Sequence, residues 1–159
     1  MYVATKVSRA FACPRERLYD LAVDNRVLAR VFTGCGPIPA ITSACLEEAE
    51  TLAEGVLRRV EMSDGSTLKE RIVGLRRPEL HAYHVLSGFK PPFAWMLVRG
   101  ESEWRFGEAG PGRSRIDWRY RFLLKSFLFA GVGLPVVKVF MRGAMQRCLA
   151  NLAELAERP

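Results

Sequence analysis

Two residues of opposite charge are the clearest candidates for chemistry in this sequence. Arg58 and Glu70 flank the turn at residues 63–66, and they lie nearly opposite each other if the segments on either side form a hairpin. Each has apolar residues two positions away on its strand, so both side chains are predicted to lie on an apolar face of the sheet. A charge on such a face is costly unless it is paired. On such a face Arg58 could anchor a carboxylate or an enolate, and Glu70 could act as a base or orient a ligand.

A second interpretation of the same two residues is an ordinary exposed ion pair on the outer face of the sheet. Such a pair contributes under about 1 kcal/mol to stability and has no chemical role. The sequence slightly favours this second interpretation, and the direction of the two side chains decides between them.

The histidines form a further candidate set. His81 and His84 lie on opposite faces of one predicted strand, and His81 shares its face with Tyr83. The candidate catalytic residues are therefore Arg58, Glu70, His81 and Tyr83. For the histidines we favour a structural role, at the surface or hydrogen-bonded. The sequence shows no Ser-His-Asp arrangement and no HExxH spacing, so it identifies no reaction, and we expect neither a metal nor a cofactor.

Composition narrows the class of partner. The chain has 159 residues, 49% of them hydrophobic, and we expect a single domain spanning residues 1–159. Its net charge is +7, but the arginines of the last two strands alternate with acidic residues, as in ordinary cross-strand pairs. A nucleic-acid partner is therefore not expected. The four cysteines lack CxxC spacing and no N-terminal signal is evident, which indicates free thiols in the cytoplasm.

Alternation and turn signals predict one strand, two short helices and six more strands. Residues 2–12 alternate as a strand, and residues 15–23 and 25–32 show helical spacing, with Asp24 as a cap for the second helix. The remaining strands are predicted at residues 41–48, 55–62, 67–75, 80–87, 93–106 and 113–124. The last two have one apolar and one charged face, so a single element must cover the apolar side.

The C-terminal segment, residues 131–157, is predicted to be that cover. Apolar residues recur along it at helical spacing, among them Leu134, Val137, Met141 and Met145. Its second half has a polar opposite face, whereas its first half is apolar nearly all round because of Val136, Val139 and Phe140. The longest apolar run, residues 126–137, is shorter than the roughly 20 residues that span a bilayer.

This order of elements resembles the START and Bet v 1-like superfamily (SRPBCC), which includes the polyketide cyclase/dehydrase and lipid-transport families. The most similar stretches are residues 13–21, residues 67–73 and the closing helix. The resemblance implies an α+β helix-grip fold, in which a seven-stranded curved antiparallel sheet wraps round a long C-terminal helix and two short helices follow the first strand. It also implies a hydrophobic cavity between sheet and helix, where members bind lipids, sterols, quinones, hormones or polyketides.

We therefore expect the protein to bind a hydrophobic small molecule or lipid, with transport of that molecule as an extension of the same role. The expected ligand-binding residues are Trp104, Trp118, Tyr120, Phe122, Val137, Met141, Met145, Phe89 and Phe93. Without the resemblance, the same residues would fit a close-packed core equally well. Two alternatives stay open: a polyketide cyclase/dehydratase-like enzyme acting in the same cavity, and a quinone or lipid chaperone acting at a membrane surface.

Strand parity predicts where such a cavity opens. The connections at residues 63–66, 88–92 and 125–133 fall at one end of the sheet, together with the apolar start of the closing helix. We expect the mouth of the cavity at this end. Val136, Val139 and Phe140 could there contact a membrane or a second copy of the chain.

Overall fold

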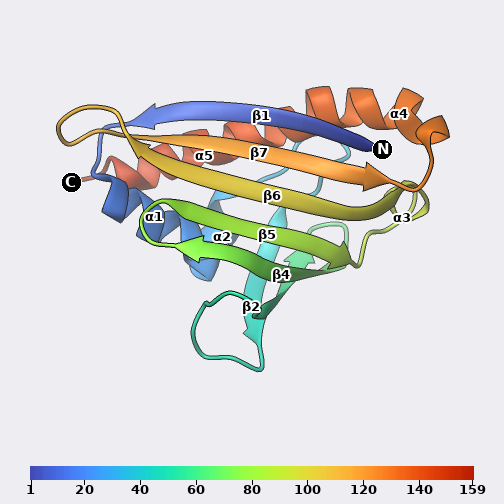
Figure 1. Cartoon of the computed structure of the whole chain (residues 1–159), viewed down its shortest axis with the longest axis horizontal. Helices are drawn as coiled ribbons and strands as arrows, with labels where there is room; N and C mark the ends of the chain where they lie inside the picture. Colours follow the sequence, from blue (N-terminus) through green and yellow to red (C-terminus); the bar gives the residue numbers. More distant parts are fainter.

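The chain folds into one antiparallel sheet that curves in front of a C-terminal helix (Figure 1). The computed structural model describes residues 1–159. The seven strands follow the order β1-β7-β6-β5-β4-β3-β2, so that the first strand pairs with the last and all other neighbours are consecutive in sequence. The strands are β1 (Tyr2–Phe11), β2 (Ile41–Glu47), β3 (Leu57–Met62), β4 (Thr67–Arg76), β5 (Leu80–Ser87), β6 (Leu97–Glu108) and β7 (Ser114–Leu124).

Helices occupy both ends of the sheet. The helices before the closing segment are α1 (Arg15–Val23), α2 (Asn25–Val31) and the short α3 (Phe93–Met96). The closing segment contains η1 (Phe127–Phe129), α4 (Ala130–Pro135), η2 (Val136–Met141) and α5 (Arg142–Ala156). The N-terminus, α3 and α4 lie at one end, which we call the open end, and α1 and the C-terminus lie at the other, the closed end (Figure 1).

The predicted strands and short helices agree with the structure to within two residues at their ends, with one exception. The sixth strand begins at Leu97, because Pro91 and Pro92 precede a helical turn, α3, in which Ala94 N donates to Lys90 O. An irregularity between Leu97 and Arg99 in the pairing with β7 then shifts the alternation. Val98 is consequently exposed, although simple alternation along the predicted strand 93–106 places it on the apolar face with Trp104, and this prediction is wrong.

The closed half of the sheet–helix interface is packed solid. Along β7 the predicted alternation is confirmed, with residues 116, 118, 120, 122 and 124 all buried. The rings of Trp104 and Trp118 stack at 3.9 Å between centroids and lie at most 2% exposed. α5 covers them with a buried stripe that includes Met145, Cys148 and Leu152. Contacts of this kind supply most of the hydrophobic stabilisation of such a fold.

The short helices attach this closed end to α5. Asp24 caps α2 as predicted, since its side chain accepts a hydrogen bond from Arg26 N at 2.8 Å. Arg17 Nε donates to Ala156 O at 3.0 Å, and Asn151 Nδ2 donates to Val31 O at 3.0 Å. These bonds hold the second half of the closing helix at the closed end.

The first half of the closing helix departs from the predicted single α-helix. It passes through a 3₁₀ turn, a short α-helix containing Pro135 and the π-helical segment η2 before α5 begins. The wider π turn changes the phase, so that the buried stripe runs through Gly133, Val137 and Met141, every fourth residue. Leu134 is 40% exposed, which corrects its predicted place in the stripe.

Gly88, at the start of the loop between β5 and α3, packs closely against the backbone of β4 at the open end, and a substitution can test this contact. Its φ is +101°, and a Cβ atom there would lie 1.9 Å from the carbonyl oxygen of Thr67. We expect Gly88→Ala to lower the free energy of unfolding by more than the ~1–3 kcal/mol of a left-handed φ alone. Gly110→Ala is the matched control, because Gly110 has a φ of +110° with no atom nearby. Equal losses in urea unfolding of the two variants would contradict this close approach.

Candidate functional site

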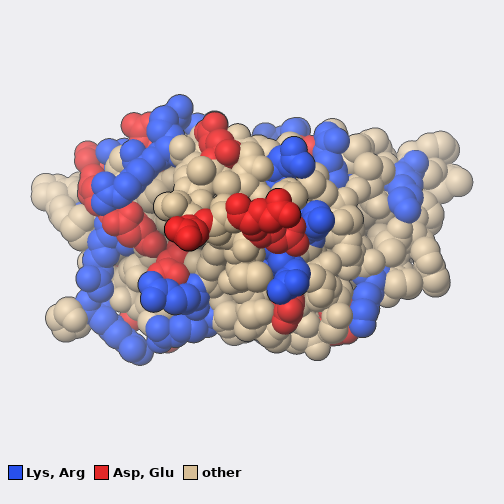
Figure 2. Space-filling model, turned by 90° about the horizontal axis from the view of Figure 1, so that it is seen from below, with Lys and Arg blue, Asp and Glu red and all other residues tan.

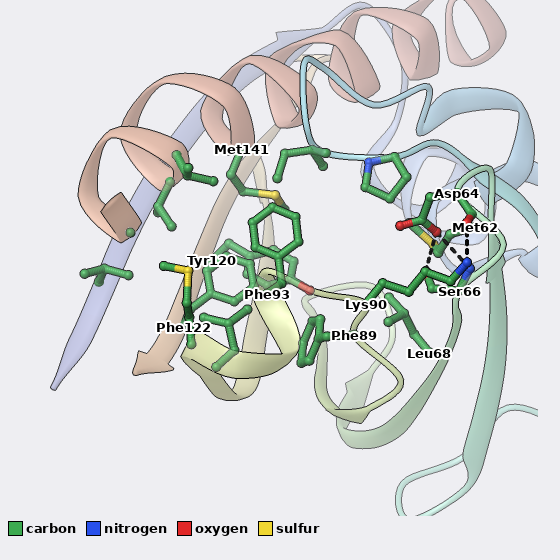
Figure 3. A pocket seen from close by; sticks show the side chains of 18 of the residues that line it. Met62, Asp64, Ser66, Leu68, Phe89, Lys90, Phe93, Tyr120, Phe122 and Met141 are labelled. Carbon is green, nitrogen blue, oxygen red and sulfur yellow. Dashed lines mark hydrogen bonds between the residues drawn. The ribbon is translucent and has the colours of Figure 1, made fainter. Parts of the chain in front are cut away.

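A cavity opens between the first half of the closing helix and the open end of the sheet (Figure 3). Its empty volume is about 800 Å³, including the part that is continuous with solvent, and about 100 Å³ of it admits the centre of a water molecule. That inner space holds several waters or a narrow apolar chain. The sheet–helix interface is therefore solid at the closed end and hollow at the open end.

Part of the cavity wall comes from the three connections that strand parity brings to one end. Asp64 and Ser66 come from the β3–β4 turn, Phe89 and Lys90 from the β5–α3 loop, and Gly133 from the closing helix. Fifteen of the twenty lining residues are hydrophobic. The predicted position of the mouth agrees with this geometry.

Six of the nine expected ligand-binding residues line this cavity, and three do not. The lining residues are Tyr120, Phe122, Val137, Met141, Phe89 and Phe93. Trp104, Trp118 and Met145 instead belong to the packed closed half, where the paired indole rings leave no space. Alternation along a strand identifies the inward face, but it does not indicate how far along that face the helix packs closely.

Several lining residues were not expected from the sequence. Met62, Leu68 and Leu97 stand at the ends of their strands nearest the mouth, and Ile38 and Pro39 belong to the α2–β2 loop. The strand residues could have been found by applying the parity argument to every strand. The loop residues carry no periodic signal, so no pattern indicates their place.

The α2–β2 loop is held against the closing helix. Gly36, with a φ of +54°, lies so close to Phe140 that a Cβ atom there would be 2.5 Å from the ring. Arg147 Nη1 donates to Gly34 O at 3.4 Å. Of the three residues expected to contact a membrane or a second copy, Phe140 thus packs partly on this loop, Val136 lines the cavity, and Val139 is 61% exposed.

A small polar group forms one side of the mouth. The Asp64 carboxylate accepts hydrogen bonds from Ser66 N and Ser66 Oγ, and Lys90 Nζ donates to Asp64 O at 2.7 Å (Figure 3). Burial raises the pKa of Asp64, but the Ser66 hydrogen bonds and the Lys90 charge outweigh it and hold the pKa below its usual value. The mouth therefore carries one negative and one positive charge at neutral pH.

Arg58 and Glu70 form a buried ion pair, so the favoured interpretation as an exposed pair is wrong. The two residues are 1% and 4% exposed. Arg58 Nε and Nη2 both donate to Glu70 Oε2, at 2.9 and 2.6 Å, and Asn25 Oδ1 accepts from Arg58 Nη1 at 3.3 Å. The strands are paired in the predicted register, with Arg58 opposite Glu70. Each charge is thus neutralised by the other in the interior.

Two tyrosines lie between this pair and the cavity. The Arg58 guanidinium carbon lies 4.9 Å from the centre of the Tyr83 ring, and the Tyr83 and Tyr120 rings are 6.4 Å apart in an edge-to-face arrangement. Burial raises the pKa of both phenols above their usual value, and the Glu70 charge adds to the effect. Both therefore hold their protons at neutral pH, and Tyr120 presents its ring to the cavity (Figure 3).

His81 is 1% exposed and neither ring nitrogen has a hydrogen-bond partner in the protein, which corrects the favoured surface or hydrogen-bonded role. Burial, and then the Arg58 charge, lower its pKa from 6.5 to about 3. His81 is therefore neutral at physiological pH. Arg58, Glu70, His81 and Tyr83 all lie outside the wall of the cavity, behind its floor.

The fold defines the class of the protein. The crystal structure of Ara h 8.0201 matches the chain with a TM-score of 0.72, covering 98% of each chain at 16% sequence identity. The structure thus has the Bet v 1-like helix-grip fold, as expected. The model of the family described as polyketide cyclase/dehydrase and lipid transport matches residues 3–157, and the chain belongs to this family. No curated protein sequence matches the chain. Membership implies the binding of hydrophobic ligands in general.

The buried ion pair gives a prediction for stability. We expect Arg58→Met to lower the free energy of unfolding by ~3–5 kcal/mol, because it leaves the Glu70 carboxylate buried without its partner. Replacing both residues, as Arg58→Met with Glu70→Leu, should restore much of that loss. Arg105→Met is the control, since Arg105 pairs with Glu103 at the surface, where a loss under ~1 kcal/mol is expected. Urea unfolding measures all three; a double variant as unstable as Arg58→Met would contradict the argument.

The lowered pKa of His81 gives a prediction for pH dependence. Below pH 6.5 the unfolded chain binds a proton that the folded chain takes up only near pH 3, so the folded state loses stability as pH falls through this window. The loss approaches about 1.4 kcal/mol per pH unit. Between pH 7 and pH 5, wild type should therefore lose about 2 kcal/mol more than His81→Phe. Parallel urea midpoints of the two proteins over this range would show that His81 is protonated in the folded state.

Proposed function

We propose that the protein binds a hydrophobic small molecule or lipid in the cavity at the open end. The observation that carries the proposal is an apolar cavity, open at one end, in a fold whose other half is packed solid. Apolar surface that stays unfilled in a folded protein lacks the contacts that stabilise a core. A hydrophobic guest supplies those contacts.

The wall favours a guest with an apolar body and one polar group. Aromatic residues and the methionines Met62, Met96 and Met141 form much of the wall, and such side chains adapt to flat or flexible apolar shapes. The polar lining groups lie at Asp64, Ser66 and Lys90 on one side of the mouth and at Tyr120 on the floor. We infer an amphipathic ligand, with its polar group at the mouth or against Tyr120. In this role the protein acts as a cytoplasmic carrier or binding protein.

A second candidate function is a reaction of the cyclase or dehydratase type on the bound molecule. It is supported by the polar layer behind the floor, in which Tyr120 on the wall contacts Tyr83, and Tyr83 contacts the Arg58–Glu70 pair. Since Tyr120 lines the cavity and keeps its proton, it could donate a hydrogen bond to a ligand carbonyl, but it could not act as a base. The family description names both cyclase/dehydrase and lipid-transport activities.

Native mass spectrometry of the purified protein, followed by organic extraction, tests the proposal directly. We expect a bound hydrophobic compound at one equivalent per chain, which the extraction then identifies. A compound that leaves the protein with one water fewer than it entered with would favour the dehydratase. A protein that carries no compound and binds no hydrophobic probe would contradict both functions.

A matched pair of variants locates the site. Val136 lines the cavity, whereas Val139, in the same π-helical segment, is 61% exposed and does not. We expect Val136→Trp to fill the cavity and to weaken binding of a fluorescent fatty acid at least about tenfold, a loss of about 1.4 kcal/mol. Val139→Trp should bind as wild type does. Equal affinities for all three proteins would place the ligand elsewhere.

A further inference from the structure

Exposed large hydrophobic residues concentrate in two segments of the chain. Eight of the eleven such residues fall within residues 95–98 and 127–140. The most exposed are Leu128 at 76%, Phe127 at 72%, Trp95 at 66%, Val139 at 61% and Val132 at 57%. Single exposed hydrophobic residues are ordinary, but a cluster of them indicates an interaction surface.

The two segments lie side by side at the open end. Lys125 N donates to Met96 O at 2.8 Å, and Lys125 Nζ donates to Ala94 O at 2.7 Å, which joins the start of η1 to α3. Trp95 on α3 and Phe127, Leu128 and Val132 on η1 and α4 therefore belong to one surface, which we call the end patch. Figure 1 shows α3 and α4 together at the tip of the molecule.

The surroundings of the end patch are positively charged. From Leu80 to Gly100, and again from Trp118 to Ala153, the sequence contains no Asp or Glu. Lys90, Lys125, Lys138 and Arg142 within these stretches are exposed and form no ion pair. On the face shown in Figure 2, the outermost part of this end carries Lys and Arg side chains on an otherwise uncharged surface, while Asp and Glu gather elsewhere.

The elements that carry the end patch also form part of the cavity wall. Met96 is the neighbour of Trp95 and lines the cavity, and Gly133 does the same next to Val132. A surface that covered the end patch would therefore lie against the outer side of this wall, at the end of the sheet where the cavity opens.

We propose that the end patch docks the protein onto the surface of an anionic lipid bilayer, with the mouth of the cavity facing the lipid. Exposed Trp, Phe and Leu side chains at protruding turns enter the boundary between head groups and acyl chains, and Lys and Arg around them attract anionic head groups. The apolar residues of the end patch thus match the acyl-chain boundary of such a membrane, and the surrounding cations match its anionic head groups.

Two other occupants fit the surface less well. A symmetric dimer would bring the end patch against itself, and four cations on each copy would face four cations on the other, an excess of positive charge that the Asp64 carboxylate beside Lys90 offsets only in part. A membrane-spanning arrangement fits the length and composition of residues 127–156, whose most apolar 18-residue window has a mean hydropathy of 1.5 and is 22% buried. However, Ala144, Cys148 and Leu152 of the same helix are fully buried in the core. Only the first half of this helix is thus free to contact lipid.

Co-sedimentation of the full chain with lipid vesicles tests the proposal. We expect the protein to bind vesicles of phosphatidylcholine with about a third phosphatidylglycerol, and to bind pure phosphatidylcholine vesicles at least about tenfold more weakly, with the difference shrinking at high salt.

Phe127→Ser with Leu128→Ser should weaken binding to the anionic vesicles at least about tenfold. Lys125→Gln, which keeps a donor for Ala94 O, should weaken it about fivefold. Tryptophan emission should shift to the blue on binding, because Trp95 would pass from water into the lipid. The change reports on Trp95, since the other two tryptophans are buried.

Val73→Ser is the matched control, since Val73 is a 41% exposed hydrophobic residue on β4, away from the end patch. It should bind vesicles as wild type does, and thermal unfolding should show all variants folded. Binding that is unchanged by the double serine variant, absent from anionic vesicles or indifferent to lipid charge would overturn the proposal. So would a dimer in analytical ultracentrifugation that dissociates on the same double substitution. Failure of the vesicle test can be distinguished from failure of the ligand test, because binding to vesicles does not require a ligand in the cavity.

Discussion

Burial of one face of a seven-stranded sheet by a single helix is the constraint on which the rest of the structure depends. The inward faces of the strands need a cover along their whole length, but α5 packs closely over only one half. In that half, two stacked tryptophans fill the space between sheet and helix. Toward the other end the helix presents small residues to the sheet, such as Gly133, and these are too small to fill the space between them. The cavity is the part of the interface that the single helix leaves unfilled.

A polar group lies behind the floor of the cavity. It consists of the Arg58–Glu70 pair, Asn25 and Tyr83, and the two charges are satisfied by one another. Removing either charge is costly, whereas replacing both need not be, so a buried pair of this kind is weak evidence for stability alone. Arg58 contacts the Tyr83 ring, and Tyr83 packs against Tyr120, so the pair is linked to the floor of the cavity through one aromatic ring. The structure thus places charge near the ligand space without exposing it there.

Sequence periodicity predicted the elements and the inward faces, and the parity of the strands predicted the open end. The direction of Arg58 and Glu70 followed from alternation, but a preference for ordinary exposed pairs outweighed it. Periodicity could not indicate where the interface changes from solid to hollow, because Trp104 and Tyr120 share one inward face of the sheet. Nor could it indicate the π turn that exposes Leu134, since that turn depends on how Pro135 and its neighbours pack against the sheet.

The cavity and the end patch have a common origin in the start of the closing helix. Pro135 and the π-helical segment change the phase of the helix, so that Gly133 and Val137 face the sheet while Leu134 and Val139 face outward. A regular amphipathic helix would have buried its large residues and filled the space beneath it. Here the helix fills little of the interior and exposes hydrophobic surface outside, on the two sides of one wall. The proposed apolar guest would cover the first surface and the proposed lipid bilayer would cover the second, so one feature of the helix accounts for both proposals.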